Sequence, residues 1–236
     1  MEPNRVVPNA RQRARAAVSA DIVAEARRQL AEVGAGALSL RAVARELGMA
    51  SSAVYRYFPS RDELLTVLII EAYDALGAVA EAAARSQDRP FARWQAVCRS
   101  VRKWALDHPH AYVLLYGSPV PGYQAPEATL APASRVTLVL TGLLSDAHRA
   151  GELEPVDGPA LPRAVATEVR PIAQAFLAGV PLATVAQAFL VWAQLFGQIN
   201  FELFGRFRGI VEAPEVLFEY AVTTMARSVG IRTTRA

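Results

Sequence analysis

Residues 39–63 read SLRAVARELGMASSAVYRYFPSRDE and contain two short helical patterns on either side of one glycine. Ser39 is a good N-cap for the first helix, and the apolar residues between 40 and 47 recur at helical spacing. Gly48 suits the end of that helix, and a second short helix follows over about 51–57. Two short helices joined by a tight turn that contains glycine predict a helix-turn-helix unit.

The second of these helices has one apolar side and one polar side. Val54 and Phe58 are four residues apart and face inward, so the polar residues between them face outward. In a helix-turn-helix unit the second helix lies in the major groove, where hydroxyls approach base edges while tyrosine and arginine donate to phosphates. A capping box then opens the next helix, and free amides at a helix start also favour phosphate. The candidate DNA contacts from these residues are Ser51, Ser52, Tyr55, Arg56, Ser60 and Arg61.

The remaining chain is helical nearly throughout, which predicts an all-α protein. A three-helix helix-turn-helix head is expected to precede a larger helical-bundle body. The predicted domains are a basic arm at 1–17, the DNA-binding head at 18–62 and the body at 63–230. The predicted helices are 19–34, 40–47, 51–57, 60–85, 90–108, 134–150, 163–178, 182–205 and 214–229, with a loop at 117–133.

Composition narrows the class of protein. The 236 residues are 53% hydrophobic, enough for a sizeable core, and the single cysteine excludes a disulfide framework or a cysteine-rich metal site. We find no catalytic constellation, metal-ligand spacing, cofactor motif, signal peptide or membrane-spanning run, so we expect a cytoplasmic non-enzyme without cofactor or metal.

The charge is unevenly distributed along the chain. Residues 1–62 hold ten arginines and six acidic residues, a net charge of +4, while the remainder has a net charge of −1. This asymmetry favours an anionic partner for the first quarter.

The stretch LSLRAVARELGMASSAVYRYFPSRDELL resembles the DNA-binding segment of the TetR/AcrR-type family of bacterial transcriptional regulators over about residues 18–67. The resemblance implies a homodimer that occupies operator DNA, usually as a repressor, and that a small ligand in the body releases. It places Ser39 and Arg41 at the backbone contact of the first helix. It places Ser51, Ser52 and Ala53 on the base-reading face, and Tyr55, Tyr57 and Arg61 at phosphate-contacting positions. Ala50 stands where a serine often caps the helix, so Ser51 or Ser52 is a candidate cap instead.

The body carries two further expectations. HPHAYVLLYGSPVPGY and WAQLFGQINFELFG resemble segments of an actinobacterial-type subgroup of these regulators. Helices 163–178 and 182–205 hold more apolar surface than one core takes, which predicts a homodimer interface through them. Aromatic residues of the body are candidates for an apolar effector cavity, although each of them also suits a plain core position. These candidates are Trp104, Tyr112, Tyr116, Phe176, Phe189, Trp192 and Phe196.

One alternative to a DNA-binding regulator has the same fold but another function. A helical scaffold or adaptor of the same architecture would respond neither to DNA nor to a ligand. A regulator binds DNA with an affinity that falls as salt rises, whereas the adaptor shows no such dependence.

Overall fold

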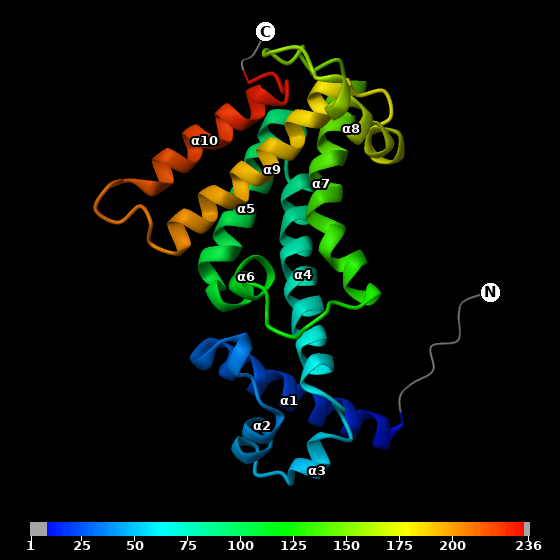
Figure 1. The fold of residues 1–236 in the computed structure, drawn as a ribbon, viewed down its shortest axis with the longest axis vertical. Coiled ribbons are helices and arrows are strands. Elements are labelled where there is room, and N and C mark those ends of the chain that lie inside the picture. Colours follow the sequence, from blue (N-terminus) through cyan, green and yellow to red (C-terminus); the bar gives the residue numbers. More distant parts are fainter. Residues whose placement is uncertain (1–8, 234–236) are drawn as a thin grey trace, which may run out of the picture. The chain divides into compact units, whose positions relative to one another are not determined.

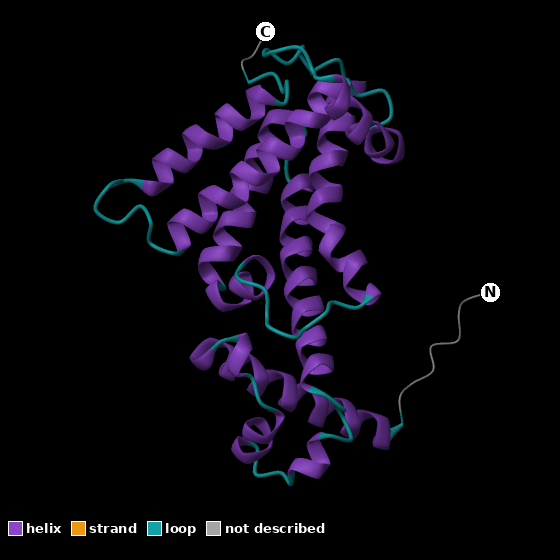
Figure 2. Cartoon of the chain, in the orientation of Figure 1, coloured by secondary structure: helices purple, strands orange, loops and turns teal. Residues whose placement is uncertain are grey.

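The computed structural model describes residues 9–233, and within that range the chain is built from ten α-helices (Figures 1 and 2). The all-α prediction is confirmed, because the only β feature of the described residues is an isolated bridge between Leu153 and Ile231. The helices are α1 (Ala10–Val33), α2 (Leu40–Glu46), α3 (Ser51–Val54), α4 (Arg61–Arg85), α5 (Pro90–Asp107), α6 (Pro109–Tyr116), α7 (Leu130–Arg149), α8 (Arg163–Phe176), α9 (Leu182–Leu203) and α10 (Pro214–Ser228), with 3₁₀ turns η1 (Ala35–Ala37) and η2 (Glu127–Thr129).

Three helices have a boundary that differs from the sequence-based expectation by more than two residues. Helix α1 begins at Ala10 instead of residue 19, so part of the predicted arm at 1–17 is helical, while residues 1–8 lie outside the described range. Helix α3 is shorter than 51–57 and continues as a turn. Helix α7 begins at Leu130 inside the predicted loop, because its Pro132 occupies the first turn, where a helix needs no amide donor.

The chain divides into two compact units. The head unit consists of the residues up to Ala72 together with His110–Leu130, and the body unit consists of Tyr73–Pro109 and the residues from Ala131 onward. Helix α4 contributes its first half to the head unit and its second half to the body unit. The sequence-based prediction places the division in the first turn of this helix, at 62/63.

One apolar cluster holds the head unit together. Ile22 and Ala26 of α1, Val43 of α2 and Leu64 of α4 are fully or almost fully buried in it. Val54 of α3 is also fully buried, which fixes the orientation of this short helix. Each side chain sits at the helical spacing that the sequence shows, so burial of one stripe per helix explains the arrangement.

The body unit packs α5, α9 and α10 against one another and α8 against α9. Trp94 of α5 is buried, and its indole Nε1 donates to the Val222 carbonyl oxygen of α10 at 3.0 Å. The guanidinium of Arg102 on α5 forms a two-armed ion pair with Glu202 of α9, with both side chains less than one-fifth exposed. These directional polar contacts add to apolar burial in fixing how α5, α9 and α10 pack against one another.

Two segments, 127–149 and α9, are long and apolar enough to cross a membrane by composition alone. In the structure both supply buried side chains to the body unit, such as Leu143 and Leu195. A core helix of a soluble protein passes the same test of length and composition, so the absence of a membrane partner stays a prediction.

Candidate nucleic-acid interface and body cavity

The turn between α2 and α3 is shaped by Gly48. Its φ of 63° lies in the left-handed region, which suits glycine at the end of a helix. The Met49 amide donates to the Ala44 carbonyl at 2.8 Å and the Gly48 amide donates to the Arg45 carbonyl at 3.1 Å, which is the hydrogen-bond pattern of a Schellman cap. The glycine therefore stops α2 and sends the chain directly into α3.

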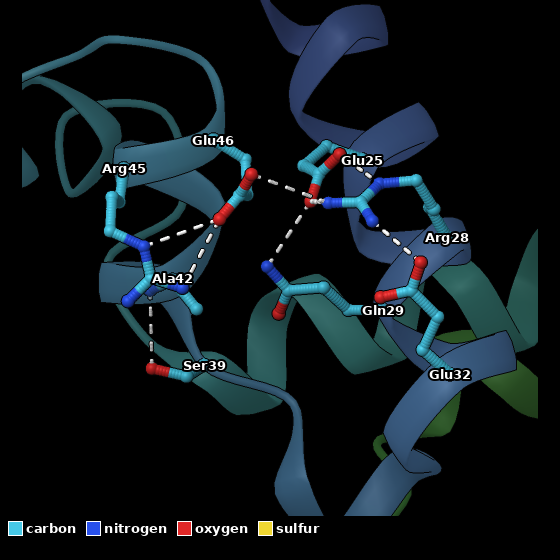
Figure 3. A network of polar contacts seen from close by, with 8 residues as sticks. All are labelled: Glu25, Arg28, Gln29, Glu32, Ser39, Ala42, Arg45 and Glu46. Carbon is cyan, nitrogen blue, oxygen red and sulfur yellow. Dashed lines mark hydrogen bonds and ion pairs between the residues drawn. The ribbon is translucent and has the colours of Figure 1, made fainter.

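A network of charged residues joins α1 to α2 (Figure 3). The Arg28 guanidinium contacts Glu25 at 2.8 Å and Glu32 at 2.6 Å on its own helix, and it reaches Glu46 of α2 at 3.7 Å. The hydrogen bond from Arg28 lowers the pKa of Glu25. The pairs lie near the surface, so their combined contribution is modest, but together they steady α2 against α1.

Helix α3 presents its polar residues to solvent. Ala50 is its N-cap and makes no side-chain capping bond, so neither Ser51 nor Ser52 serves as the cap. Both serines are exposed, and Ala53 between them and the buried Val54 is half-buried. The hydroxyls of Ser51 and Ser52 therefore stand on the outward face, as the sequence predicted for groups that read a base edge or a phosphate.

The residues after α3 divide into exposed and partly buried groups. Tyr55 is 42% exposed and Arg56 is exposed, whereas Tyr57 packs against the head core. The Arg15 guanidinium of α1 lies 5.0 Å from the centre of the Tyr57 ring, and its Nη2 donates to the Arg56 carbonyl oxygen at 3.2 Å. Tyr57 is thus an anchor for α1 as well as a candidate phosphate contact.

The two serines that begin helices act as caps. The Ser39 hydroxyl accepts from the Ala42 amide at 3.5 Å, and the Ser60 hydroxyl accepts from the Glu63 amide at 3.1 Å. Ser60 is exposed and Ser39 is half-buried, and Arg41 on the first turn of α2 is exposed. These positions leave Arg41 and Ser60 accessible to a DNA backbone.

Arg61 differs from the other predicted contacts. Its guanidinium Nε and Nη2 are buried and have no hydrogen-bond partner among the described residues. A buried donor without a partner is costly, so this side chain gains by moving to an acceptor such as a phosphate oxygen. The structure therefore turns two donors of Arg61 inward, unlike the other candidate contacts.

The body unit contains a cavity of about 270 Å³ between α7, α8 and α9. Trp94 and Leu144 are buried at its base, whereas Thr137 and Phe189 are exposed and mark its opening. None of its lining residues is charged, which favours a neutral, apolar occupant. The lining consists of Trp94, Thr137, Leu140, Thr141, Leu144, Ile172, Leu177, Val185, Ala188, Phe189, Val191, Trp192, Leu195 and Val229.

The structure brings two of the seven aromatic candidates, Phe189 and Trp192, into this cavity lining. Phe196 is buried beside Trp192, with ring centres 4.6 Å apart, but is not among the residues that line the cavity. Phe176 is more than half exposed. The remaining three, Trp104, Tyr112 and Tyr116, are also absent from the lining. The Trp104 ring makes a tilted contact with His108, with ring centres 5.3 Å apart, and Tyr112 makes a tilted contact with Tyr116 in the head unit, with ring centres 5.1 Å apart.

Sequence reasoning missed the contribution of α7 to the cavity. Leu140 and Leu144 are four residues apart, and Thr137 and Thr141 lie on the adjoining positions of the same side. The apolar spacing was visible in the sequence, but the same spacing serves an ordinary core helix. Only the packing of α7 beside α8 and α9 shows that this side faces a space.

Comparisons with known proteins agree with this geometry. Residues 22–68 match the family model described as bacterial regulatory proteins of the tetR family, and residues 94–225 match the tetracyclin repressor-like C-terminal domain. The HTH-type transcriptional regulator Rv1816 of Mycobacterium tuberculosis is 41% identical over 216 residues, covering 89% of this chain and 91% of that protein.

Solved structures show the same fold. The structure of SCO4313 is 34% identical, covers 93% of this chain and 98% of its own, and superposes with a TM-score of 0.75. PfmR from Thermus thermophilus, described as a TetR family transcriptional regulator, superposes with a TM-score of 0.59 at 22% identity, covering 91% of this chain and 99% of its own. The latter likeness concerns the fold alone.

Proposed function

Because the chain belongs to the tetR family of bacterial regulatory proteins, we propose that this transcriptional regulator is a cytoplasmic homodimer that represses by occupying operator DNA until a small apolar effector releases it. The observation that carries the proposal is the exposed polar face of α3, held by the buried Val54 and by the Gly48 turn. The roles of individual residues in DNA binding are part of the proposal.

The DNA contacts divide into base-facing and phosphate-facing groups. Ser51, Ser52 and Ala53 carry the base-facing role, and their short side chains offer few direct bonds to bases. Tyr55 and Arg56 after α3, and Arg41 on α2, are exposed and supply donors for phosphates. Phosphate contacts and DNA shape therefore provide much of the affinity.

The first test measures binding to genomic fragments across a series of salt concentrations. A regulator gives an affinity that falls linearly with salt on logarithmic axes, and the scaffold alternative gives no binding and no slope. Tyr55→Phe removes one hydroxyl and should weaken binding to all duplexes by the same factor, since a phosphate contact carries no sequence information. A changed sequence preference in this variant would assign Tyr55 to base reading instead.

The proposed dimer interface is centred on α9. Leu190 and Phe201 are both more than half exposed on this helix, and the small Ala193 lies exposed between them. Exposed apolar surface repeated along one helix is typical of a surface that a partner covers. Pairing through such helices commonly buries roughly 1,200–2,000 Å² or more.

The second interface helix is better assigned to α10 than to α8. The sequence alone pairs α9 with α8, yet the outward side of α8 carries the exposed charges Glu168 and Arg170. Helix α10, which packs against α9, exposes Val216 and leaves Tyr220 71% exposed. Charged residues are depleted from the centres of interfaces and aromatic residues are enriched there, which favours α10.

Sedimentation velocity of three variants separates the two assignments. Leu190→Glu and Tyr220→Glu should give monomers, because each buries a charge at the proposed interface. Gln174→Glu adds the same charge to the exposed side of α8 and should leave the dimer intact. Dissociation by Gln174→Glu together with an intact Tyr220→Glu dimer would return the interface to α8 and α9.

The effector proposal rests on the cavity in the body unit. A volume of about 270 Å³ and an uncharged lining suit a neutral molecule with a compact apolar core. Thr137 and Thr141 offer hydroxyls near the opening, where a single polar group of the ligand finds partners. A charged ligand would lose hydration inside the cavity without a compensating partner among the lining residues.

Tryptophan fluorescence with two probes tests this proposal, since Trp94 and Trp192 line the cavity. The neutral probe 2-naphthol should quench the signal and lower DNA affinity, whereas the anion 2-naphthoate should do neither. Ala188→Leu fills part of the cavity and should abolish the response, while Ala183→Leu, exposed on the same helix and outside the lining, should preserve it. Equal responses in both variants would rule out this cavity as the effector site.

A further inference from the structure

The first turns of α1 bury almost nothing. Every residue from Ala10 to Ala17 is exposed, and the first buried side chain of the helix is Ile22. The ribbon in Figure 1 shows this dark blue end of α1 extending outward. Most helices in proteins are stabilised by packing an apolar side, so these two turns need another explanation.

The charges on these turns are unfavourable for an isolated helix. Arg11, Arg13 and Arg15 lie within the first six residues of α1, and no acidic residue of this helix precedes Asp21. Cations near a helix N-terminus oppose the helix dipole, and Arg11 and Arg15 form a like-charge pair one turn apart. An anion bound beside them would offset both effects.

Local contacts nevertheless hold the turns in a fixed place. Asn9 and Gln12 form a reciprocal capping box, with both hydrogen bonds at 2.9 Å. Arg15 then donates to the Arg56 carbonyl oxygen and covers the ring of Tyr57, as described above. The helix start is therefore tied to the segment that follows α3, within the head unit.

Helix geometry assigns the arginines to different sides. Arg11 precedes Arg15 by four residues, which places the two about 40° apart around the axis and about 6 Å apart along it. Arg13 lies about 160° around the helix from Arg15, on the opposite side. Because Arg15 faces the end of α3, Arg11 shares that side and Arg13 does not.

We infer that the Arg11–Arg15 side of α1 is a second DNA contact, which binds backbone phosphates flanking the base pairs under α3. Arg11 supplies the phosphate contact. The contacts of Arg15 with Arg56 and Tyr57 hold the start of α1 in place and so fix where Arg11 lies. The contact adds affinity and salt dependence without reading sequence, since phosphates are the same at every step. This inference rests on the proposed DNA-binding function.

The experiment compares full-length wild type with Arg11→Ala, Arg11→Lys and the matched control Arg13→Ala. Fluorescence anisotropy measures affinity for a duplex recovered from genomic fragments and for the same duplex shortened at its flanks, over a salt series. Arg11→Ala should reduce the salt slope by about one per bound protomer on the long duplex. Arg11→Lys keeps the charge and should retain the slope, and Arg13→Ala should match wild type.

The outcomes separate this inference from the proposed function. The contact is supported if Arg11→Ala alone among the variants has a smaller salt slope than wild type, and only on the long duplex. Wild-type binding with an unchanged slope in Arg11→Ala overturns the inference while the proposed function stands, and equal losses in Arg11→Ala and Arg13→Ala overturn it in favour of a diffuse field. Absence of salt-dependent binding in wild type overturns both.

Discussion

Replacement of Gly77 by alanine tests how α4 and α7 are fastened inside the body unit. The Arg135 guanidinium of α7 contacts Asp74 at 2.8 Å and Glu81 at 2.7 Å, one on each side of Gly77 along α4. It also donates to the Asp74 carbonyl oxygen at 3.0 Å. The absence of a side chain at Gly77 leaves room for Arg135 to cross α4 at this point.

A Cβ atom at Gly77 would lie 2.8 Å from the Arg135 Cβ and 2.7 Å from its Nε. The first of these atoms is close to the backbone of α7, so the arginine cannot simply swing aside. We expect the clash and the weakened ion pairs to cost about 2–3 kcal/mol. Helix propensity alone would favour alanine by about 1 kcal/mol, so Gly77→Ala should destabilise by about 1–2 kcal/mol.

The sign should reverse when Arg135 is absent. Arg135→Ala alone should cost about 1–2 kcal/mol because its partly exposed ion pairs are lost. In that background Gly77→Ala meets no obstruction and should stabilise by about 1 kcal/mol, which gives a coupling of about 2–3 kcal/mol.

Urea unfolding of the four proteins at one fixed protein concentration measures this cycle, since association would otherwise shift the apparent stability. The same contribution from Gly77→Ala in both backgrounds would refute the reasoning. A stabilising Gly77→Ala in wild type would show that α7 does not pass α4 at the distance described.

Three further predictions concern the turn, the pH dependence and the cysteine. Gly48→Ala should lower the unfolding free energy by about 1 kcal/mol because alanine strains at φ 63°, whereas Gly36→Ala, which has space and no positive φ, should be nearly neutral in the same urea titration. The hydrogen bond from Arg135 lowers the pKa of Glu81, so this carboxylate stabilises the fold above its unfolded pKa and loses that contribution as pH falls through its folded pKa. Acid titrations should therefore show a shallower decline of stability in Arg135→Ala than in wild type, and identical curves would contradict the pairing. Burial raises the pKa of the Cys98 thiol, so a thiol reagent should modify it only in denaturant, and rapid labelling of the native protein would contradict its burial.

Local patterns in the sequence were sufficient for the helix-turn-helix. Gly48 marks a turn that needs a left-handed residue, Val54 marks the inward side of α3, and Ser60 caps α4, and the structure has each in that place. Each inference depends on residues within one or two turns of one another. Short-range rules are reliable at this distance because backbone geometry alone fixes which neighbours meet.

Other features depended on contacts between distant residues. The extension of α1 to Ala10 is tied by Arg15 to a carbonyl 41 residues away, which no periodicity in the first residues indicates. The sequence also did not indicate that two donors of Arg61 face inward, because an arginine at the start of a helix is usually an exposed charge. The sequence could not separate the aromatic residues that line the cavity from those that do not. An aromatic residue at core spacing suits a filled core and a cavity wall equally well.

The sequence by itself determined the all-α class, the helix-turn-helix and the apolar character of the body, because these follow from spacing and capping along single helices. Only the tertiary structure decided which sides of those helices remain open: α7 and α9 border a cavity, and α9 and α10 expose apolar residues. The physical reason is that an apolar stripe specifies that a side must be covered, whereas what covers it depends on how the helices pack.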